Sequence, residues 1–240
     1  MRVVALVQAR TGSRRLPGKV LMDLHGRPML AQLLSRLRQA ARLDEVVVAT
    51  SDLPQDDPVA DVAQAKGVRV FRGDERDVLA RMLGAARMAD ADVVVRITGD
   101  CPLVDPGVVD QVVGELEGHD LASNAIHRTF PRGLDTEAVT RDALERIGEL
   151  ATSPEAREHV TWFAYRERPD LFRLRSVESG DGDDAYAALD WSVDTAEDLE
   201  LVRRLWPSAA AGASWRELAE LDRPSGTSDG RGDGPSPRDG

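Results

Sequence analysis

Over the first 120 residues, hydrophobic and polar positions follow two patterns that alternate along the chain. Continuous apolar runs predict buried strands, because a strand that is covered on both faces needs no polar side; these runs lie at 3–7, 45–51, 68–72 and 92–98. Apolar residues at three- and four-residue spacing predict helices between them; these stretches cover 28–42, a short segment ending at Gly67, and 77–88. Asp105 and Pro106 then resemble an N-cap followed by the first helical residue. Strands that alternate with helices predict a mostly parallel sheet with helices on both faces.

The pattern of hydrophobic and polar positions changes after residue 120. Short apolar runs predict further strands, at 121–126, 136–139, 171–178 and 188–193. The cap-like residues 152–155 predict a helix through about Arg166, and Thr195 starts another with Leu199, Val202 and Leu205 as its buried stripe. We therefore predict one domain over 1–206, in which 120–190 binds an acceptor and forms a dimer contact. A weak C-terminal helix is expected within 207–223, at 214–221, and a disordered tail over 224–240, where there is almost nothing to bury.

Composition narrows the function. The chain has 240 residues, of which 42% are hydrophobic, enough for one good core. Its net charge of −11 and pI of about 4.9 argue against a nucleic-acid partner. One cysteine, Cys101, leaves no internal disulfide framework, and before Pro102 it reads as a packed small residue rather than a nucleophile. We see no signal peptide and no apolar run near the length of a membrane span, so we expect a cytoplasmic protein with no membrane partner.

A basic, glycine-containing loop follows the first predicted strand. Arg10, Arg14, Arg15 and Lys19 lie within ten positions of an otherwise acidic chain. We expect Gly12 and Gly18 to allow backbone conformations that turn N–H groups toward an anion, with the cations as counter-charge. Such a loop at the carboxyl end of a first strand is typical of nucleotide sites, although a solvated basic turn would look the same.

Spacing excludes two common phosphate loops. Five residues separate Gly12 from Gly18, and Val20 follows Lys19, so the Walker A pattern is absent. The dinucleotide pattern of three closely spaced glycines is absent too. Asp100 ends the fourth predicted strand, where a carboxylate is well placed to bind Mg²⁺; an Asx turn or a helix cap is the alternative.

Four motifs together resemble one family. Residues 8–21 (QARTGSRRLPGKVL) closely resemble the signature of the CMP-sugar cytidylyltransferases, which include the CMP-Kdo and CMP-sialic acid synthetases. The resemblance is greatest to the spore coat polysaccharide biosynthesis cytidylyltransferase branch, and three later stretches share it: 96–103 (RITGDCPL), 128–137 (RTFPRGLDTE) and 193–199 (VDTAEDL). Matches in one order, spread from residue 3 to about 206, are far more specific than a single loop.

The resemblance implies a fold and a reaction. The fold would be a single-domain α/β, Rossmann-like nucleotidyltransferase (GT-A-like), with a mixed, mostly parallel sheet flanked by helices. The reaction would be Mg²⁺-dependent transfer of CMP from CTP to an acidic sugar for polysaccharide biosynthesis, releasing pyrophosphate, and the enzyme would be a homodimer.

It also implies residue roles. The catalytic residues would be Arg10, Lys19 and Asp100, and Asp194 would join Asp100 as the metal ligand, with Asp190 as a rival for that role. The nucleotide-binding residues would be Ala9, Arg10, Gly12, Ser13, Lys19, Asp77, Arg81 and Asp100. For Asp77 and Arg81 an ordinary i, i+4 helix pair is an equal alternative, and for Asp194 a helix cap is one.

The acceptor site would lie in the second half of the chain. Its expected residues are Asn124, Arg128, Arg132, Glu137, Arg157 and His159. Arg128, Arg132 or Arg157 could hold a carboxylate or phosphonate bidentately, whereas Arg157 and His159 could equally form a solvated helix face. Three other functions stay open: nucleotidyl transfer to a phosphonate or sugar phosphate, a nucleotide-sugar-dependent glycosyltransferase, and a non-catalytic scaffold.

Overall fold

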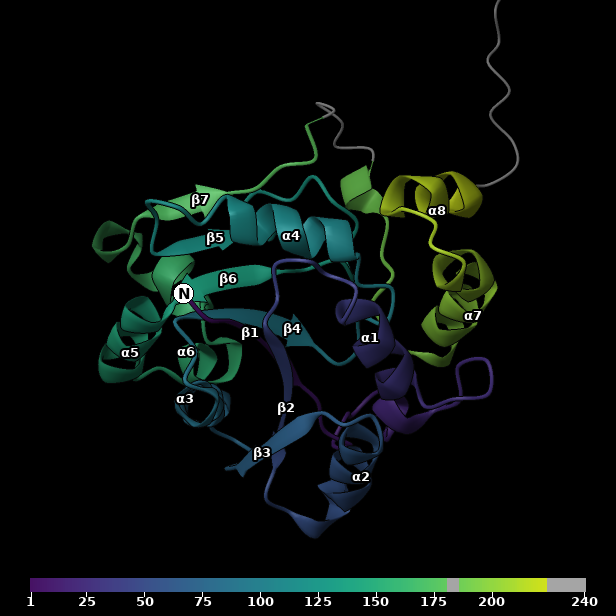
Figure 1. Cartoon of the computed structure of the whole chain (residues 1–240), viewed down its shortest axis with the longest axis horizontal. Helices are drawn as coiled ribbons and strands as arrows, with labels where there is room; N and C mark the ends of the chain where they lie inside the picture. Colours follow the sequence, from purple (N-terminus) through teal and green to yellow (C-terminus); the bar gives the residue numbers. More distant parts are fainter. Residues whose placement is uncertain (181–185, 224–240) are drawn as a thin grey trace, which may run out of the picture.

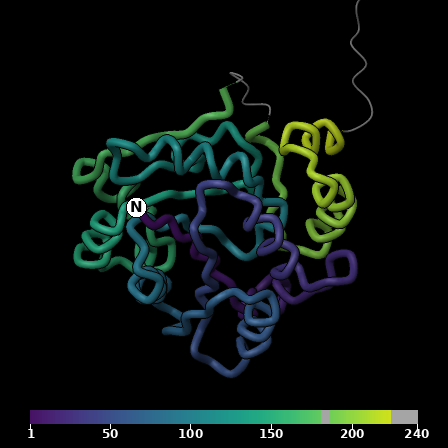
Figure 2. The backbone as a smooth tube through the Cα atoms, in the orientation of Figure 1, coloured from purple at the N-terminus to yellow at the C-terminus, as the bar shows by residue number. Residues whose placement is uncertain are grey.

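The computed structural model describes residues 1–180 and 186–223 of the chain. Within these residues, the protein folds around one seven-stranded sheet. The strand order is β3-β2-β1-β4-β6-β5-β7 (Figure 1), and Figure 2 traces the backbone in the same orientation. The strands are β1 (Val3–Gln8), β2 (Glu45–Ser51), β3 (Arg69–Gly73), β4 (Val93–Thr98), β5 (Leu121–Ser123), β6 (Glu137–Thr140) and β7 (Leu174–Ser176). The first four are mutually parallel, and β6 runs antiparallel to both of its neighbours, β4 and β5. The predicted mixed, mostly parallel sheet is confirmed.

Helices cover both faces of this sheet (Figure 1). In β1, Val3, Ala5 and Val7 pack into one core and Val4 and Leu6 into the other, as expected of a strand buried on both faces. The first core holds α1 (Met29–Leu37), α2 (Asp57–Ala65), α4 (Pro106–Gly114), α7 (Ala196–Ala210) and α8 (Trp215–Asp222). The second holds α3 (Val78–Ala89), α5 (Arg141–Leu150) and α6 (Pro154–His159). The short helices are η1 (Lys19–Leu21), η2 (Pro54–Asp56), η3 (Phe163–Glu167), η4 (Pro169–Leu171) and η5 (Tyr186–Ala188).

Several predicted helix starts are confirmed by capping bonds. The Asp105 side chain accepts from the N–H groups of Gly107 and Val108 at the start of α4. Thr195 and Asp198 form a reciprocal capping box at the start of α7. Sequence reasoning missed α5, which follows β6 directly with Thr140 as its N-cap.

Two predictions in the second half were wrong. The helix predicted through Arg166 is interrupted at Val160, where φ is 56°, and the chain continues as a π-helical turn, η3. No strand covers 188–193 among the described residues; η5 and an isolated bridge between Arg132 and Asp190 stand there. The strands β5 and β7 are also shorter than predicted.

The C-terminal helix is an integral part of the fold. The helix α7 continues past the predicted boundary at 206, and the helix predicted at 214–221 is confirmed as α8. Trp215, Leu218 and Ala219 are buried in the same core as α1 and α4, so α8 is packed rather than marginal. The tail predicted over 224–240 lies outside the described residues. No helix in the described part of the chain has the length and apolar character needed to span a membrane.

Candidate active site

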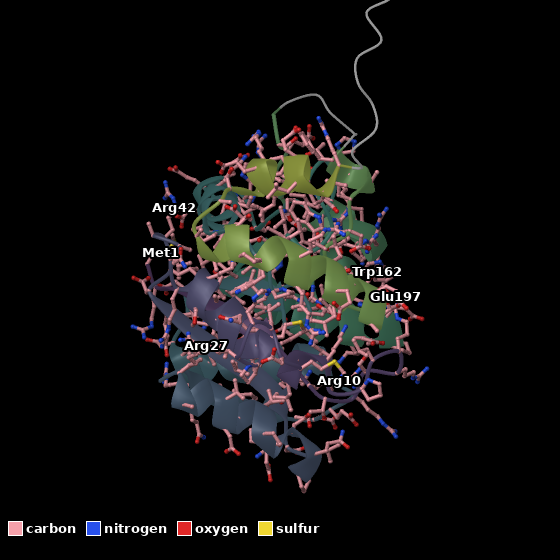
Figure 3. The ribbon with its side chains drawn as sticks, turned by 90° about the vertical axis from the view of Figure 1, so that its right-hand side faces the viewer. Met1, Arg10, Arg27, Arg42, Trp162 and Glu197 are labelled. Atoms are coloured by element: carbon pink, nitrogen blue, oxygen red, sulfur yellow. The ribbon has the colours of Figure 1, made fainter. Side chains whose placement is uncertain are left out.

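The site lies between β1 and β4, where the order in which the chain adds strands to the sheet reverses. From β1 the chain continues to β2 on one side, whereas β4 lies on the other side. The Gly99 N–H donates to the Gln8 carbonyl at 2.8 Å, so the ends of β1 and β4 are joined. Figure 3 shows Arg10 and Trp162 toward one side of the molecule and Met1 toward the opposite side. Crevices at the carboxyl ends of strands, at such a switch point, are where α/β sheets bind ligands.

Close packing fixes the loop after β1. A Cβ on Gly99 would lie 2.9 Å from the Ala9 Cβ, so only glycine allows this approach. The Thr11 N–H and hydroxyl both donate to Asp56 Oδ1 at 2.7 Å, an anchor that sequence reasoning missed. Gly18 has φ of 71°, as predicted.

The expectations for Gly12 and Ser13 were partly wrong. Gly12 does not adopt a left-handed conformation, and the Ser13 N–H donates to the Thr11 carbonyl at 2.8 Å. The Ser13 N–H is therefore engaged within the loop itself, although both residues line the cavity described next.

A large basic cavity opens beside this loop. Its volume is about 970 Å³, and seven Lys and Arg residues but four Asp and Glu residues line it. The predicted residues that line it are Ala9, Arg10, Gly12, Ser13, Lys19, Arg81, Asp100, His159 and Asp194. The lining also includes Arg14 and Arg15, which were expected only as general counter-charge, and residues to which sequence reasoning gave no role: Glu75, Arg76, Arg96 and Glu158. The excess of cations suits a polyanion such as a triphosphate.

Lys19 lies at the centre of the polar network. Its Nζ donates to Asp100 Oδ2 at 2.8 Å, to Asp194 Oδ1 at 2.9 Å and to the Val193 carbonyl at 2.7 Å. Burial opposes the charge of Lys19, but the two carboxylates outweigh it and raise the pKa of the ammonium. Burial likewise opposes ionisation of Asp100, and the charge and hydrogen bond of Lys19 outweigh it and lower the pKa of that carboxyl. Both groups are therefore held charged at neutral pH.

Asp194, not Asp190, lies beside Asp100. Asp194 pairs with Arg15 at 2.6 Å in addition to Lys19. Asp190 instead accepts from the Ser192 N–H at 2.9 Å and pairs with Arg132 at 3.4 Å. Asp190 is thus held outside the basic cavity.

Arg81 is the most enclosed cation of the cavity. Its residue is 2% exposed, and it bonds to the carbonyls of Asp74 and Glu75. Its Nε is buried and has no hydrogen-bond partner in the described structure. Burial, followed by the charge of Arg10, lowers the pKa of the Arg81 guanidinium. Buried polar groups are normally hydrogen-bonded, so an unpaired donor at this position is uncommon.

The structure takes Asp77 and Arg157 away from the roles expected of them. Asp77 caps α3 by accepting from the Ala80 N–H at 2.9 Å, and its other oxygen pairs with Arg157. Neither residue lines a described cavity. Their charges neutralise each other between α3 and α6.

A second cavity of about 370 Å³ adjoins the first. Arg96, Thr98 and His159 line both cavities. Of the predicted acceptor residues, the lining of the second cavity contains Arg128, Arg132, Glu137 and His159. Asn124 does not line it, because it is fully buried and its amide bonds to the Leu134 carbonyl and the Thr136 N–H. Asn124 fixes the loop that carries the other residues.

Two arginines of the second cavity, Arg96 and Arg128, are closely paired with carboxylates. Arg96 lies opposite Glu137 in the β4–β6 register, and its Nη1 is 2.6 Å from Glu137 Oε2. Arg128 forms a bidentate pair with Asp135 at 2.5 and 3.0 Å. We name this second space the acceptor cavity, after the residues in its lining that were predicted to bind an acceptor.

The helix α8 supports the loop that carries Arg128. The rings of Phe130 and Trp215 pack edge to face with centroids 5.2 Å apart. Trp191 is fully buried and its Nε1 donates to Asp222 at 2.8 Å. Gly133, with φ of 95°, approaches so closely that a Cβ would lie 2.7 Å from the Trp191 carbonyl carbon.

Cys101 does not act as a nucleophile in this geometry. It is buried, and burial raises the pKa of its thiol well above the ordinary range. Its sulfur lies 3.1 Å from the Thr98 hydroxyl. The interpretation of Cys101 as a packed residue is confirmed.

The comparison with known families decides the assignment. The model of the family described as cytidylyltransferase matches residues 4–210. The chain belongs to the cytidylyltransferase family. It is therefore an enzyme of the nucleotidyltransferase class, and the resemblance seen in the sequence motifs is confirmed.

Individual relatives agree with this assignment. The spore coat polysaccharide biosynthesis protein SpsF of Bacillus subtilis is 34% identical over 216 residues, which cover 86% of this chain and 87% of SpsF. A cytidylyltransferase structure from Leptospira borgpetersenii is 33% identical, with a TM-score of 0.85 over 92% of this chain and 93% of that one. CMP:2-keto-3-deoxy-manno-octonic acid synthetase, in complex with CTP, is 25% identical, with a TM-score of 0.66 over 87% of this chain and 99% of the synthetase.

One wall of the acceptor cavity was missed entirely by sequence reasoning. Trp162, Tyr165 and Arg166 line it from η3 and the residue before it. In a chain with only 4% aromatic residues, a Trp and a Tyr three positions apart were the available signal. A regular helix would have distributed these side chains differently, and the π turn could not be inferred from spacing.

Proposed function

We propose that this cytidylyltransferase transfers CMP from CTP to a small, hydroxyl-rich anionic acceptor and releases pyrophosphate. The observation that carries the proposal is the union of the two cavities at Arg96, Thr98 and His159, beside the Lys19–Asp100 pair. A basic space for a triphosphate and a smaller space for an acceptor meet there. The name of the synthetase with CTP supports a sugar-acid acceptor and the base, and the name of SpsF supports a role in polysaccharide biosynthesis.

In the proposed reaction an acceptor oxygen attacks the α-phosphorus of CTP. A new P–O bond forms while the bond to the β-phosphate bridging oxygen breaks, and pyrophosphate leaves with the electron pair. The acceptor hydroxyl loses its proton. The cations of the basic cavity neutralise the phosphate charge, and catalysis is mainly positioning and charge stabilisation.

The residues present fit the predicted magnesium ion. Asp100 and Asp194 converge on one ammonium, and their side chains are each 29% exposed. No cluster of three or more His, Cys, Asp or Glu ligands occurs in the described residues. Two carboxylates are nonetheless what Mg²⁺ uses when substrate phosphates complete its coordination. We propose that Asp100 and Asp194 hold the ion, which would polarise the α-phosphate when bound.

The proposed function is tested by pyrophosphate release. Each of the four nucleoside triphosphates is incubated with Mg²⁺ and a panel of sugar acids, sugar phosphates and phosphonates. We expect release from CTP with one acceptor class. A pre-formed CMP-sugar that is hydrolysed or transferred without pyrophosphate would instead support a glycosyltransferase, and absence of nucleotide binding by calorimetry would support a scaffold.

The metal assignment has its own control pair. Asp194→Asn should abolish Mg²⁺-dependent activity, whereas Asp190→Asn should keep the Mg²⁺ concentration for half-maximal activity within about two-fold, since Asp190 lies outside the cavity. Removal of divalent ions by EDTA should stop the wild-type reaction. Equal losses in both variants would contradict the assignment of Asp194.

The homodimer, predicted from the family resemblance, and the cytoplasmic location, expected from sequence features alone, stay proposals. Light scattering coupled to size-exclusion chromatography would test the dimer. A mass equal to one chain across a range of concentrations would refute it.

A further inference from the structure

One wall of the acceptor cavity has an unusual backbone. Trp162, Tyr165 and Arg166 line this cavity, and none of them lines the basic cavity. Two of the three belong to η3, a π-helical turn, a geometry that is rare and often located at functional sites. Directly before it, Val160 has φ of 56° and ψ of −88° with a residue exposure of 1%. A β-branched residue in this region is strained, so the fold maintains this wall against a local energetic cost.

Charge pairing distinguishes Arg166 from the other arginines of the cavity. Arg96 and Arg128 have carboxylate partners within 2.6 Å, and Arg132 has Asp190 at 3.4 Å. Such pairs present donors and acceptors together and suit hydroxyl groups, while their net charge is neutralised. Within residues 1–180 and 186–223, no carboxylate pairs with Arg166, whose guanidinium carbon lies 5.9 Å from the centroid of the Tyr165 ring. It is an exposed cation in a cavity whose other guanidinium charges are compensated.

Tyr165 supplies no negative charge to Arg166. Burial, followed by the charge of Glu137, raises the pKa of Tyr165 to about 12. The phenol therefore stays protonated at neutral pH and leaves the Arg166 charge available for a ligand. Trp162, half-buried at the same wall, offers an apolar ring face beside that charge.

We propose that Arg166 is the specificity-determining residue that holds the anionic group of the acceptor. Trp162 contacts the carbon skeleton of the acceptor, and the paired arginines Arg96 and Arg128 face its hydroxyls. This inference rests on the proposed function, whose acceptor it describes more closely. It replaces the sequence-based expectation that Arg128, Arg132 or Arg157 holds the acid. A carboxylate and a phosphonate share the chemistry that a guanidinium recognises.

The test measures acceptor binding directly. Calorimetry in the presence of CMP compares 3-deoxy-manno-octulosonate, galacturonate and hydroxymethylphosphonate with the uncharged sugars galactose and glucitol. We expect at least one anion to bind the wild type, and the uncharged sugars to bind ten-fold more weakly or not at all. The anion that binds identifies whether the acceptor group is a carboxylate or a phosphonate.

The variants are matched in position and exposure. Arg166→Gln should weaken binding of that anion ten-fold or more, the range expected for a lost charged hydrogen bond, and Arg166→Lys should restore part of it. Arg168→Gln is the control, because Arg168 is exposed in the same segment and pairs with Asp170 at 2.8 Å; it should change binding less than two-fold. Circular dichroism should show that both Gln variants keep the wild-type fold.

Three results would overturn the inference. These are unchanged anion binding in Arg166→Gln, a larger loss in Arg128→Gln than in Arg166→Gln, or no binding of any anion of the panel to the wild type. The assay of pyrophosphate release separates this inference from the proposed function. Release with an unchanged acceptor KM in Arg166→Gln leaves the function standing and removes the inference. Anion binding that depends on Arg166, without pyrophosphate release from any triphosphate, would support the role of Arg166 in binding and contradict the proposed reaction.

Discussion

The Lys19 ammonium lies 2.8 Å from the Asp100 carboxylate, although 81 positions separate the two residues in the sequence. Lys19 also bonds Asp194, so one cation holds two carboxylates from the ends of distant segments. The side chain of Lys19 is 9% exposed, which makes the arrangement dependent on mutual compensation of charge. The family resemblance gives Lys19 and Asp100 catalytic roles, together with Arg10, and gives Asp194 a role as metal ligand.

Lys19→Met should abolish activity and lower the free energy of unfolding by about 1–3 kcal/mol. This is less than the roughly 3–5 kcal/mol for breaking a fully buried pair, because the carboxylates are partly exposed and Arg15 still pairs with Asp194. Urea denaturation at constant m-value measures the loss. Lys19→Met combined with Asp100→Asn should recover part of the stability but none of the activity. A double variant less stable than Lys19→Met alone would contradict the compensation.

The pH dependence of stability should follow the two shifted groups. The lowered pKa of Asp100 adds stability that is complete above its ordinary value of 3.8 and is lost as pH falls through the lowered value. The raised pKa of Lys19 adds stability that is complete below 10.5 and is lost as pH rises through the raised value. Chemical denaturation of Asp100→Asn and wild type from pH 3 to 7 should therefore give stabilities that converge at the acid end. A constant difference over that window would rule out this contribution of Asp100.

At Val160, replacement by glycine should reduce stability no more than replacement by alanine, which is the reverse of the usual order. At a regular buried position Gly is about 0.5–1 kcal/mol less stable than Ala, but a positive φ penalises Ala by about 1–2 kcal/mol. We expect Val160→Gly to be at least as stable as Val160→Ala by urea denaturation. Val95, fully buried in β4, is the control at which Ala should be the better replacement. The same order at both positions would show that the Val160 backbone is not strained.

Gly99→Ala should perturb both stability and activity. The added methyl group would lie 2.9 Å from Ala9 Cβ and 3.1 Å from the Gln8 carbonyl oxygen, a backbone atom that cannot simply rotate away. Overpacking of this kind costs about 1–3 kcal/mol, and displacement of Ala9 would lower kcat/KM for CTP. Gly114→Ala is the matched control: its nearest contact would be 3.5 Å, and a helical Ala should stabilise by about 0.4–1 kcal/mol. Similar losses in both variants would indicate a general intolerance of added volume.

Cys101 should not react with thiol reagents in the folded protein. It is the single cysteine of the chain, is buried, and has a pKa raised well above 9.0, so neither access nor thiolate is available. Titration with a chromogenic disulfide should give no reaction under native conditions and one equivalent in denaturant. Full modification of a protein that retains activity would refute this description of the site.

The elements that carry the basic cavity follow from local sequence and general rules of sheet topology. Parallel strands bring their carboxyl ends to one edge, so the loop after β1 and the carboxylate after β4 lie at the same edge of the sheet. The choice between Asp190 and Asp194 required the structure, because both precede the same helix and differ only in how the chain turns. Sequence patterns can therefore indicate the groups at this edge, where chain direction alone decides which strand ends are neighbours.

The acceptor cavity was predicted less well for a physical reason. The positive φ at Val160 opposes the local preference of a β-branched residue and is imposed by tertiary packing. Whether an arginine is free or paired also depends on contacts between segments, as Arg157 with Asp77 shows across 80 positions. Spacing identified the residue types but could not determine which charges are already compensated.

The link between Trp191 and Asp222 bears on how the enzyme matures during translation. Asp222 is synthesised after every strand of the sheet and after Asp194. Once synthesis has passed Asp194, the nascent chain contains every residue that lines the basic cavity. At that stage the loop that carries Arg128 still lacks the support of α8. The ability to bind nucleotide should therefore arise earlier in synthesis than the ability to select an acceptor.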